Sequence, residues 1–363
     1  MPHDDFVVGL DIGTTKICTV VGRPTEGGGL DIIGVGLHPS AGLKRGIVVD
    51  RQLTIESVRQ SVAQAERMAG VDIRAAYVGI SGDHISSTNV TGRVHTGPRQ
   101  EVEQEDIEKA IQSARDSVTL PSDRQIIHTV VRDFAVDGQQ GVSRPLGMSG
   151  RRLDVEVHVV TGMASIITNL ERCVEEAGVS VLSQVLEPLA TSLAVLTEAE
   201  RDLGVILVDI GGGTTDIAVF LDDAIYHTSA IPVAGNQITR DLAKLLRISM
   251  DEAESIKCRY GRALAAAVPP DDEIQITSAD GEHNERVKQQ LVAEVIQARL
   301  EEIFEMVWAD VKRAGVGERC SGGVVISGGG SQLPDTPRLA SAVMGEMSAR
   351  VGKPRGLTGM VKA

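Results

Sequence analysis

Aromatic residues are scarce in this chain of 363 residues, which has four Phe, three Tyr and one Trp. The hydrophobic core must therefore be filled mainly by Val, Ile, Leu and Ala. Basic residues are also fewer than acidic ones. The sequence has 36 Lys and Arg and 50 Asp and Glu, which gives a formal net charge of −14. So acidic a surface repels phosphate backbones and anionic lipid headgroups, and we expect no nucleic-acid partner.

Paired cysteines and long apolar runs are absent from the sequence. The four cysteines are scattered and form no Cys-x-x-Cys pair, which argues against a disulfide framework or a zinc site and favours a reducing cytosol. No apolar run approaches the ~18 residues needed to span a bilayer. The N-terminus lacks the basic and apolar regions of a signal peptide, so we expect a cytoplasmic protein.

One segment near the N-terminus recurs in the second half of the chain. The first copy is Val7-Val-Gly-Leu-Asp11-Ile-Gly13-Thr-Thr15-Lys-Ile17, and the second is Val205-Ile-Leu-Val-Asp209-Ile-Gly-Gly-Gly213-Thr-Thr215-Asp-Ile217. Each copy has an apolar run, an Asp, a Gly/Thr turn and a second apolar run, a pattern typical of two strands joined by a tight turn. The repeat therefore predicts two similar lobes.

Helices and strands alternate between these copies. Apolar spacing predicts a helix over 55–69, with Thr54 as its N-cap and Gly70 as its stop, and a second helix over 167–177 that is closed by Gly178. Strands are predicted at Ala76–Ile80, Val179–Leu186 and Gly323–Ser327. This alternation indicates an α/β architecture.

Two segments differ from the rest of the chain in their residue composition and pattern. Between about Ser86 and Val160 we expect a small α+β insertion in the first lobe, with a loop at Gly138–Gly141, and from about Asp241 to Arg313 a further subdomain with a long amphipathic helix. The expected division is 1–85 with 161–203 for the first lobe, 86–160 for the insertion, 204–240 with 314–363 for the second lobe, and 241–313 for the partner-binding subdomain.

The two Gly/Thr turns are suited to hold phosphate, because glycine lets backbone N–H groups approach closely and Thr hydroxyls add donors. Asp11 and Asp209, each at a strand end, can hold Mg²⁺ through water against phosphate oxygens. Two facing turns would grip a triphosphate across a cleft, whereas one such turn alone fits a polar hairpin equally well. The turn residues are Gly13, Thr14, Thr15, Lys16, Gly211, Gly212, Gly213, Thr214 and Thr215.

Two more segments are candidates for the same site. Gly328, Gly329, Gly330 and Ser331 follow a predicted strand, and their backbone can lie flat against a purine or ribose, although such a stretch is also an ordinary loop. Glu187 opens a helix with Pro188 in its first turn. Its carboxylate either caps that helix or orients an attacking water or a hydrated Mg²⁺, and in the second case Glu187 and Asp209 are the candidate catalytic residues.

The order of the two turns, Glu187-Pro-Leu-Ala190 and Ser327-Gly-Gly-Gly330 resembles the actin/Hsp70/sugar-kinase superfamily. The resemblance implies an actin-like ATPase fold of two lobes around a nucleotide cleft, with ATP and Mg²⁺ as ligands. It puts Asp11 and Asp209 near the metal, the Gly/Thr turns at the β- and γ-phosphates, and Glu187 near the attacking water. Gly328–Ser331 would flank the nucleoside.

Several longer stretches are similar to the FtsA family of bacterial cell-division proteins, and the similarity runs from Phe6 to about Val361. They are Val78-Gly-Ile-Ser-Gly82-Asp-His-Ile, Arg144-Pro-Leu-Gly-Met-Ser-Gly150-Arg-Arg-Leu153, Ile231-Pro-Val-Ala-Gly235-Asn236-Gln-Ile-Thr239-Arg-Asp241 and Ala253-Glu254-Ser-Ile-Lys257-Cys-Arg-Tyr-Gly261. The resemblance implies a polymerising ATP-binding scaffold of the division ring, at most a weak ATPase. It places Gly235 and Asn236 at the nucleotide, and Glu254 and Lys257 beside the ribose and adenine, although the last two also fit an ordinary surface pair one turn apart.

The same resemblance implies partners. Arg299 and Glu302 match the motif with which the family holds the C-terminal tail of the tubulin-like protein FtsZ, although they also fit a solvated helix face. The family assembles head to tail, and its insertion takes part in this assembly and in contacts with other division proteins. Its members work on the inner face of the cell membrane at the division site.

FtsA proteins continue beyond the position that matches Ala363 with a further helix, a linker and a membrane-binding helix. Either this sequence is a piece of a longer protein or the membrane is reached through a partner. We therefore expect no direct lipid binding by these 363 residues.

Two other functions fit the same fold. A metabolite kinase needs a positioned base beside an acceptor hydroxyl, and no acceptor site is recognisable in the sequence. The pilus-assembly relative PilM shares the insertion and lacks the membrane helix. The stretches Arg144–Gly150 and Ala253–Lys257 favour FtsA over PilM.

Overall fold

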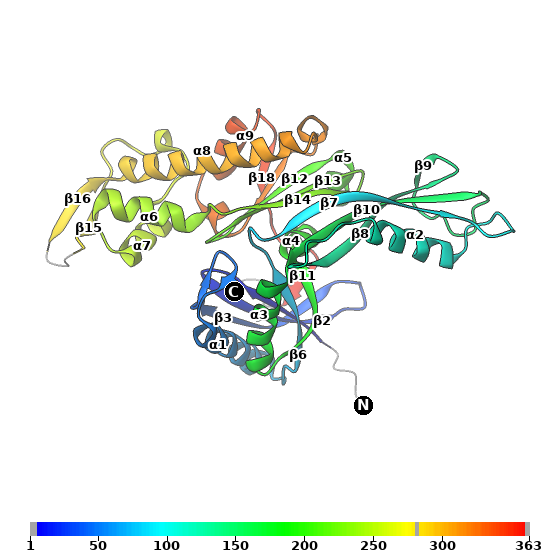
Figure 1. Ribbon diagram of the computed structural model, residues 1–363. Helices are drawn as coiled ribbons and strands as arrows, with labels where there is room; N and C mark the ends of the chain where they lie inside the picture. The colour runs from blue at the N-terminus through cyan, green and yellow to red at the C-terminus, as the bar shows by residue number, and fades with distance from the viewer. Residues whose placement is uncertain (1–5, 280–282, 360–363) are drawn as a thin grey trace.

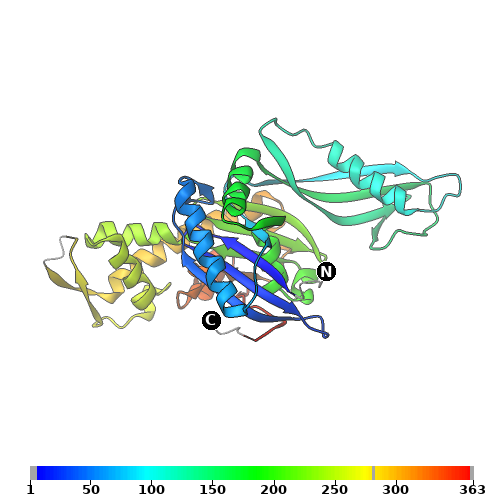
Figure 2. The same cartoon turned by 90° about the horizontal axis from the view of Figure 1, so that it is seen from below.

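A computed structural model describes residues 6–279 and 283–359 of the chain. Separate sheets form the first lobe, the insertion and the second lobe, and the insertion and the subdomain of helices α6 to α8 lie at opposite ends of the molecule (Figures 1 and 2). The two lobes thus form the middle of the structure, where the repeated segments meet.

The first lobe is built on a six-stranded sheet of order β11-β6-β1-β2-β3-β19. Alternate residues of β1, such as Val8 and Leu10, are buried under helices α1 and α3, with which they share one hydrophobic cluster. The strands are β1 (Val7–Ile12), β2 (Lys16–Pro24), β3 (Leu30–Pro39), β6 (Ala75–Ile80), β11 (Ser180–Leu186) and β19 (Leu357–Gly359), with a small hairpin β4 (Leu43–Lys44) and β5 (Ile47–Val48). The helices are α1 (Arg51–Ala69) and α3 (Ala164–Glu176).

Helix α1 begins before the predicted N-cap. Asp50 is the N-cap, because its Oδ1 accepts a hydrogen bond from the Leu53 N–H at 3.1 Å. The hydroxyl of Thr54 lies inside the helix and donates to the carbonyl of Asp50 at 2.8 Å. The prediction of Thr54 as N-cap was therefore wrong, whereas Gly70 as the stop is confirmed by its left-handed φ of 69°.

The insertion is a four-stranded antiparallel sheet of order β7-β10-β8-β9 with helix α2 packed on it. Its elements are β7 (Ser86–His95), α2 (Gln104–Asp116), β8 (Arg124–Val136), β9 (Gln139–Val142) and β10 (Arg152–Met163). The loop predicted at Gly138–Gly141 is instead a tight turn followed by β9. Asp137 and Gly138 have φ of 51° and 89°, the two positive values that a twisted hairpin turn requires.

The second lobe holds a five-stranded sheet of order β14-β13-β12-β17-β18, and its first hairpin repeats that of the first lobe. Asp209 lies opposite Asp216 across β12 and β13, as Asp11 lies opposite Cys18 across β1 and β2. The strands are β12 (Val205–Ile210), β13 (Thr215–Leu221), β14 (Ala224–Ile231), β17 (Val324–Ser327) and β18 (Ala349–Val351). The internal repeat predicted from the sequence is thus confirmed.

The remaining helices cover this lobe and join it to the first. They are α4 (Glu187–Val195), α5 (Glu198–Leu203), α6 (Gly235–Leu246), α7 (Met250–Tyr260), α8 (Gln289–Arg313) and α9 (Thr336–Val343), with single turns η1 (Ala265–Ala267), η2 (Gly317–Arg319) and η3 (Gly329–Gln332) and a hairpin β15 (Glu273–Thr277) and β16 (Asn284–Lys288). On α8, Val292, Ile296 and Ile303 are buried in the core. No helix of the described residues, α8 included, combines the length and apolarity needed to cross a membrane.

One predicted boundary needs correction. The segment 314–363 was assigned to the second lobe, but Leu357–Gly359 forms β19, which pairs in parallel with β3 at the edge of the first-lobe sheet. The chain therefore returns to the lobe in which it began. A strand of three residues carries too little periodicity to be recognised from the sequence alone.

The insertion packs against β14, the edge strand of the second-lobe sheet. Ser87 Oγ donates to the carbonyl of Thr228 at 2.8 Å, and Asn89 Nδ2 donates to the carbonyl of Tyr226 at 2.9 Å. Side chains of β7 therefore cover backbone acceptors that an edge strand would otherwise expose. The insertion is thus tied to both lobes, through its chain ends to the first and through this seam to the second.

His158 is the buried centre of this seam, with 1% of its surface exposed. Its Nδ1 lies 2.7 Å from Asn89 Oδ1 and its Nε2 lies 3.0 Å from Thr228 Oγ1. Burial, followed by the charges of His227 and Arg132, lowers the pKa of His158 from 6.5 to about 3. The ring is therefore neutral, with Nδ1 donating to the amide oxygen and Nε2 accepting from the hydroxyl.

We expect His158 to make the protein less stable as the pH falls. Folding lowers the pKa of His158, so as the pH falls the unfolded chain takes up this proton before the folded chain does. The contribution of His158 to the free energy of unfolding is therefore present above pH 6.5 and is lost as the pH falls toward about 3. Urea unfolding of the parent and of His158→Gln should give a free-energy difference that shrinks from about pH 7 to about pH 5. The exposed His95→Gln is the control, and a difference for His158→Gln that does not change with pH would contradict this assignment.

Candidate functional site

The two Gly/Thr turns lie against each other between the lobes. A Cβ atom at Gly212 would collide with Thr15 Cγ2, and one at Gly213 would lie 2.7 Å from Thr14 Oγ1. Both turns close with the same backbone bond, from Gly13 N to Lys16 O at 3.1 Å and from Gly211 N to Thr214 O at 3.0 Å. The absence of a side chain at the second-lobe glycines therefore lets two equivalent turns form one site.

Four carboxylates converge beneath these turns, from Asp11 on β1, Glu187 on α4, Asp209 on β12 and Asp216 on β13. Burial and then the charge of Asp209 raise the pKa of Asp11 to about 6, and the same two causes raise that of Asp216 to about 8. Burial, Asp11 and Asp216 raise the pKa of Glu187 well above its usual range. Asp216 is only 7% exposed, whereas Asp11 retains accessible surface.

Mostly neutral donors hold these carboxylates. Thr191 Oγ1 donates to Asp209 Oδ2 at 3.1 Å, and Thr214 Oγ1 donates to Asp216 Oδ2 at 3.4 Å. Burial raises the pKa of Asp209 as well as that of Asp216; the charge of Lys16 opposes the rise at Asp209, and a hydrogen bond from the Gly82 N–H opposes it at Asp216. The cluster thus holds more acidic groups than cations, and the crowding keeps part of them protonated.

This excess of acidic groups fits a hydrated divalent cation. Within the described part of the chain, no three Asp, Glu, His or Cys side chains come close enough together to hold a metal ion directly. Mg²⁺ keeps several waters and needs only one or two carboxylates when phosphate oxygens supply other ligands. The donors present, Asp11 and Asp209, therefore fit Mg²⁺ held through water.

Glu187 does not cap helix α4. The N-cap position belongs to Leu186, no side chain caps the helix, and Pro188 lies in its first turn as predicted. Ser81 donates to the Glu187 carboxylate, and this bond works against the rise in its pKa that Asp11 and Asp216 cause. The capping interpretation was wrong, and the carboxylate instead faces the acidic cluster.

Glu254 and Lys257 form an internal contact between two helices. Lys257 Nζ donates to Glu254 Oε2 at 2.7 Å, to Thr239 Oγ1 at 2.9 Å and to the carbonyl of Gly235 at 3.3 Å. Its side chain is only 12% exposed. Since the Gly235 N–H donates to the carbonyl of Gly211 at 3.0 Å, this pair is connected directly to the second Gly/Thr turn.

The Gly-rich segment after β17 also borders the cluster. Gly328 has a φ of 79°, and a Cβ atom there would collide with Asp209 Oδ1. The segment then turns into η3, where Ser331 Oγ donates to the carbonyl of Gly328 at 2.7 Å. The start of this segment, Gly328, therefore packs directly against Asp209 of the acidic cluster.

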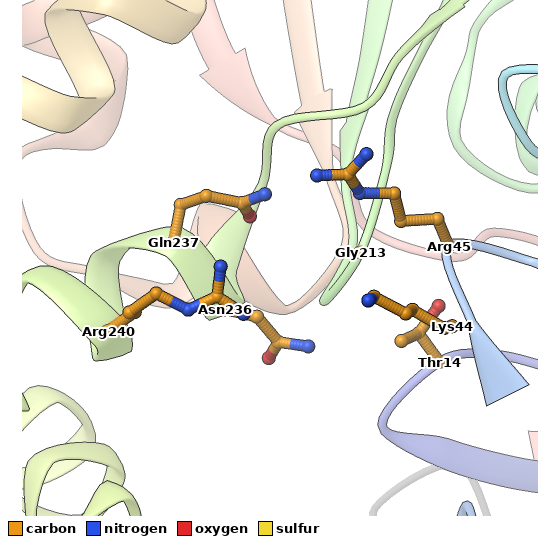
Figure 3. A pocket seen from close by; sticks show the side chains of 7 residues that line it. All are labelled: Thr14, Lys44, Arg45, Gly213, Asn236, Gln237 and Arg240. Atoms are coloured by element: carbon orange, nitrogen blue, oxygen red, sulfur yellow. The ribbon is translucent and has the colours of Figure 1, made fainter. Parts of the chain in front are cut away.

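A cavity of about 160 Å³ opens beside the turns, between the lobes. Figure 3 shows Thr14, Lys44 and Arg45 on one side of it and residues of α6 on the other, with Gly213 between. The residues from the second lobe are Gly213, Asn236, Gln237 and Arg240. Three cationic side chains from two lobes thus converge on one hollow.

Several of these residues were not predicted from the sequence. Asp216 occupies in the second hairpin the position that Cys18 occupies in the first, so the repeated motif gave no signal for a second acidic residue there. Thr191 lies one turn beyond Glu187 on α4, and only the packing of that helix brings it to Asp209. Lys44 and Arg45 gave no signal, because the sequence does not show where the β4–β5 hairpin folds.

Arg299 and Glu302 lie apart from this site, on α8, and neither lines the cavity. Arg299 Nε donates to Asp241 Oδ2 at 2.7 Å, and its NH1 donates to Glu302. The Arg299 side chain is 26% exposed and that of Glu302 is 50% exposed. The pair is therefore accessible, but its charges already compensate each other within the chain.

Comparison with known proteins places these features in one family. A family profile described as "Cell division protein FtsA" matches residues 206–363, and one described as "SHS2 domain inserted in FTSA" matches residues 82–161. The "Cell division protein FtsA" of Pseudomonas aeruginosa is 43% identical over 360 residues, covering 98% of this chain and 86% of that protein. That of Escherichia coli (strain K12) is 37% identical over 362 residues, covering 98% and 86%.

Solved structures show the same fold at low sequence identity. The "PilM-PilN type IV pilus biogenesis complex" matches with a TM-score of 0.68 and 16% identity, covering 97% of this chain and 90% of that chain. The "Crystal structure of MreB 5 of Spiroplasma citri bound to AMPPNP" matches with a TM-score of 0.59 and 15% identity, covering 96% and 92%. The predicted actin-like fold with its inserted domain is thereby confirmed.

Because the four carboxyl groups of the acidic cluster are buried close together, we expect them to destabilise the protein when no ligand is bound. The pKa of Asp216 rises from 3.8 to about 8 on folding, so the folded chain keeps the carboxyl proton up to a higher pH than the unfolded chain does. The free energy of unfolding therefore falls as the pH rises between those two values. Asp216→Asn should therefore raise the melting temperature near neutral pH by about 1–2 °C, as expected for ~1 kcal/mol in a chain of 363 residues. Thermal unfolding without nucleotide tests this.

The control is Asp271→Asn, which alters an exposed carboxylate in a turn. The gain from Asp216→Asn should also be larger at about pH 8 than at about pH 6, because the parent loses the stabilising proton over that range. A variant that melts below the parent at both pH values would show that Asp216 stabilises the empty fold.

Proposed function

The chain belongs to the FtsA family and is an actin-like cell-division protein, and from that premise we propose that it binds Mg-ATP between its two lobes. The observation that carries the proposal is the direct contact of the two Gly/Thr turns over the acidic cluster. Gly212 and Gly213 lie against Thr15 and Thr14, so donors from both lobes face the same small volume. A polyphosphate is the ligand that such a double set of backbone and hydroxyl donors suits.

The roles of the residues follow from their surroundings. Thr14 and Thr15, with the backbone N–H groups of both turns, would donate to phosphate oxygens. Asp11 and Asp209 would hold Mg²⁺ through water, and the bound ion would supply positive charge between these carboxylates and the phosphates. Burial and the neighbouring carboxylates raise the pKa of Glu187 in the empty site; the positive charge of a bound ion would lower it again, and the ionised Glu187 could then accept the proton of an attacking water. Any hydrolysis would be slow, and the nucleotide would serve mainly to set the conformation of the scaffold.

Loss of Asp209 tests the metal and phosphate site. Asp209→Ala should weaken Mg-ATP binding by about 2–5 kcal/mol, roughly 30-fold to several thousand-fold, because it removes a metal contact and leaves the Thr191 hydroxyl without its acceptor. Titration calorimetry measures the affinity, and a melting curve checks that the variant is folded.

Glu187→Gln is the matched comparison in the same cluster. It keeps the shape of the side chain, so it should spare Mg-ATP binding and slow any hydrolysis. Unchanged affinity in Asp209→Ala would remove Asp209 from the site. A large loss of binding in Glu187→Gln would show that this carboxylate holds the metal.

We further propose that the subdomain 241–313 binds the C-terminal tail of FtsZ, and that the protein thereby connects the division ring to the inner face of the membrane. Support comes from Arg299 and Glu302 on one accessible face of α8. A carboxylate of the tail would take the place of Glu302 beside the Arg299 guanidinium, which would keep its hydrogen bond to Asp241. Glu302 would then be free to accept a hydrogen bond from a basic group of the tail. Exchange of one exposed ion pair for another costs little, because exposed pairs contribute only about 0–1 kcal/mol.

Arg299→Glu should weaken tail binding by about 1–3 kcal/mol through a lost charge-assisted bond and new repulsion. Fluorescence anisotropy with a labelled tail peptide at low and physiological salt measures this, and the parent affinity should fall as salt rises. Arg313→Glu makes the same charge change on the same helix at a side chain that is 76% exposed, and serves as the control. If the parent does not bind the tail, the assignment of this partner fails.

The insertion is the surface that we propose for self-association and for other division proteins. It projects from the lobes and has its own hydrophobic cluster, so it can meet a neighbouring molecule without unfolding (Figure 2). A contact between this end of one molecule and a different surface of the next does not close, and it therefore produces an open filament.

A further inference from the structure

Three of the side chains that line the cavity are cationic. Among the described residues, Lys44, Arg45 and Arg240 form no ion pair and no side-chain hydrogen bond, and the lining contains no acidic residue (Figure 3). The chain as a whole carries a net charge of −14, whereas the charged side chains of this lining are all cationic. Such a group of uncompensated cations indicates a place for an anion.

The β4–β5 hairpin that carries Lys44 and Arg45 touches both Gly/Thr turns. The Gly46 N–H donates to Thr14 Oγ1 of the first turn at 3.4 Å, and a Cβ atom at Gly213 of the second turn would lie 3.1 Å from Arg45 Cα. The base of the hairpin is fixed, since the N–H groups of Val49 and Asp50 both donate to the carbonyl of Gly42. The two cations are thus presented by the first lobe to the second.

Arg240 is held in place by the second lobe. It follows Asn236 by one turn on α6, and the first residues of that helix are bonded to the second Gly/Thr turn, with Asn236 N donating to Gly212 O at 2.8 Å. Closure of the cleft therefore brings Arg240 toward Lys44 and Arg45. Like charges that approach across a cleft without a counter-ion repel each other and oppose closure.

The position of the cavity indicates which part of a nucleotide fills it. Thr14 and Gly213, from the two phosphate-binding turns, line it, whereas none of the residues expected beside the nucleoside does. These nucleoside residues are Glu254, Lys257 and Gly328 to Ser331. The cavity therefore continues the site on the phosphate side.

On these grounds, we propose that Lys44, Arg45 and Arg240 form a clamp for the terminal phosphate, which lets the two lobes close on a nucleoside triphosphate and less fully on a diphosphate. The inference rests on nucleotide binding in this cleft, as proposed above. A γ-phosphate adds negative charge where three cations face each other, so it replaces repulsion by charge-assisted hydrogen bonds. The diphosphate leaves part of that repulsion in place, and the two nucleotide states then differ in lobe closure.

The affinities for a non-hydrolysable ATP analogue and for ADP, both with Mg²⁺, test this by calorimetry. Arg240→Gln, and separately the double variant Lys44→Gln with Arg45→Gln, should weaken the triphosphate about tenfold or more and ADP less than about threefold. ADP binding also shows that each variant is folded. Lys244→Gln, which removes an exposed cation from the same helix, is the control and should change neither affinity.

Hydrogen–deuterium exchange of the segment 42–50 gives a second measurement that does not depend on hydrolysis. The triphosphate analogue should slow exchange there more than ADP does in the parent, and this difference should vanish in Arg240→Gln. Equal losses of affinity for both nucleotides, or none for either, would overturn the clamp and leave nucleotide binding intact. A parent that binds neither nucleotide would instead overturn the proposed function.

Discussion

The close approach of the second Gly/Thr turn to the first is the constraint on which the rest of the site depends. Any side chain at Gly212 would collide with Thr15, so the distance between the lobes is set by the absence of two Cβ atoms. The same approach brings Asp209 and Asp216 of the second lobe to Asp11 and Glu187 of the first. The interlobe site therefore combines close packing of the turns with unfavourable crowding of carboxyl groups beneath them. A cationic ligand would relieve this crowding.

The seam between the insertion and β14 makes the insertion part of this arrangement. The chain enters the insertion through Ser81 and Gly82, which donate to Glu187 and Asp216 of the acidic cluster. Directly afterwards, Ser87 and Asn89 of β7 bond to the second lobe. A change in the separation of the lobes must therefore be accommodated either at the seam or by rotation of the insertion. This connection is a physical route from the cleft to a distant surface, because it runs through bonded groups that belong to both lobes.

Local patterns could be predicted from the sequence, and contacts between distant segments could not. The repeat predicted both hairpins and both turns, because strand, turn and strand are set by neighbouring residues. The N-cap of α1 was misplaced from Asp50 to Thr54, since both residue types serve as caps and the apolar spacing does not separate them. The cations Lys44 and Arg240 lie far apart in sequence, and only the folding of the hairpin over α6 brings them to one cavity.

The charges of the cleft are arranged in two layers that cannot compensate each other. The carboxylates lie beneath the turns, whereas Lys44, Arg45 and Arg240 line the cavity beside them, and the Gly/Thr turns separate the two groups. A metal ion alone would relieve the first layer and a phosphate alone the second. Mg-ATP carries both charges at the separation that the turns impose, so it can relieve both layers at once. The proposed ligand would therefore neutralise both groups of charges. In the empty cleft, repulsion among the carboxylates and among the cations favours opening of the cleft.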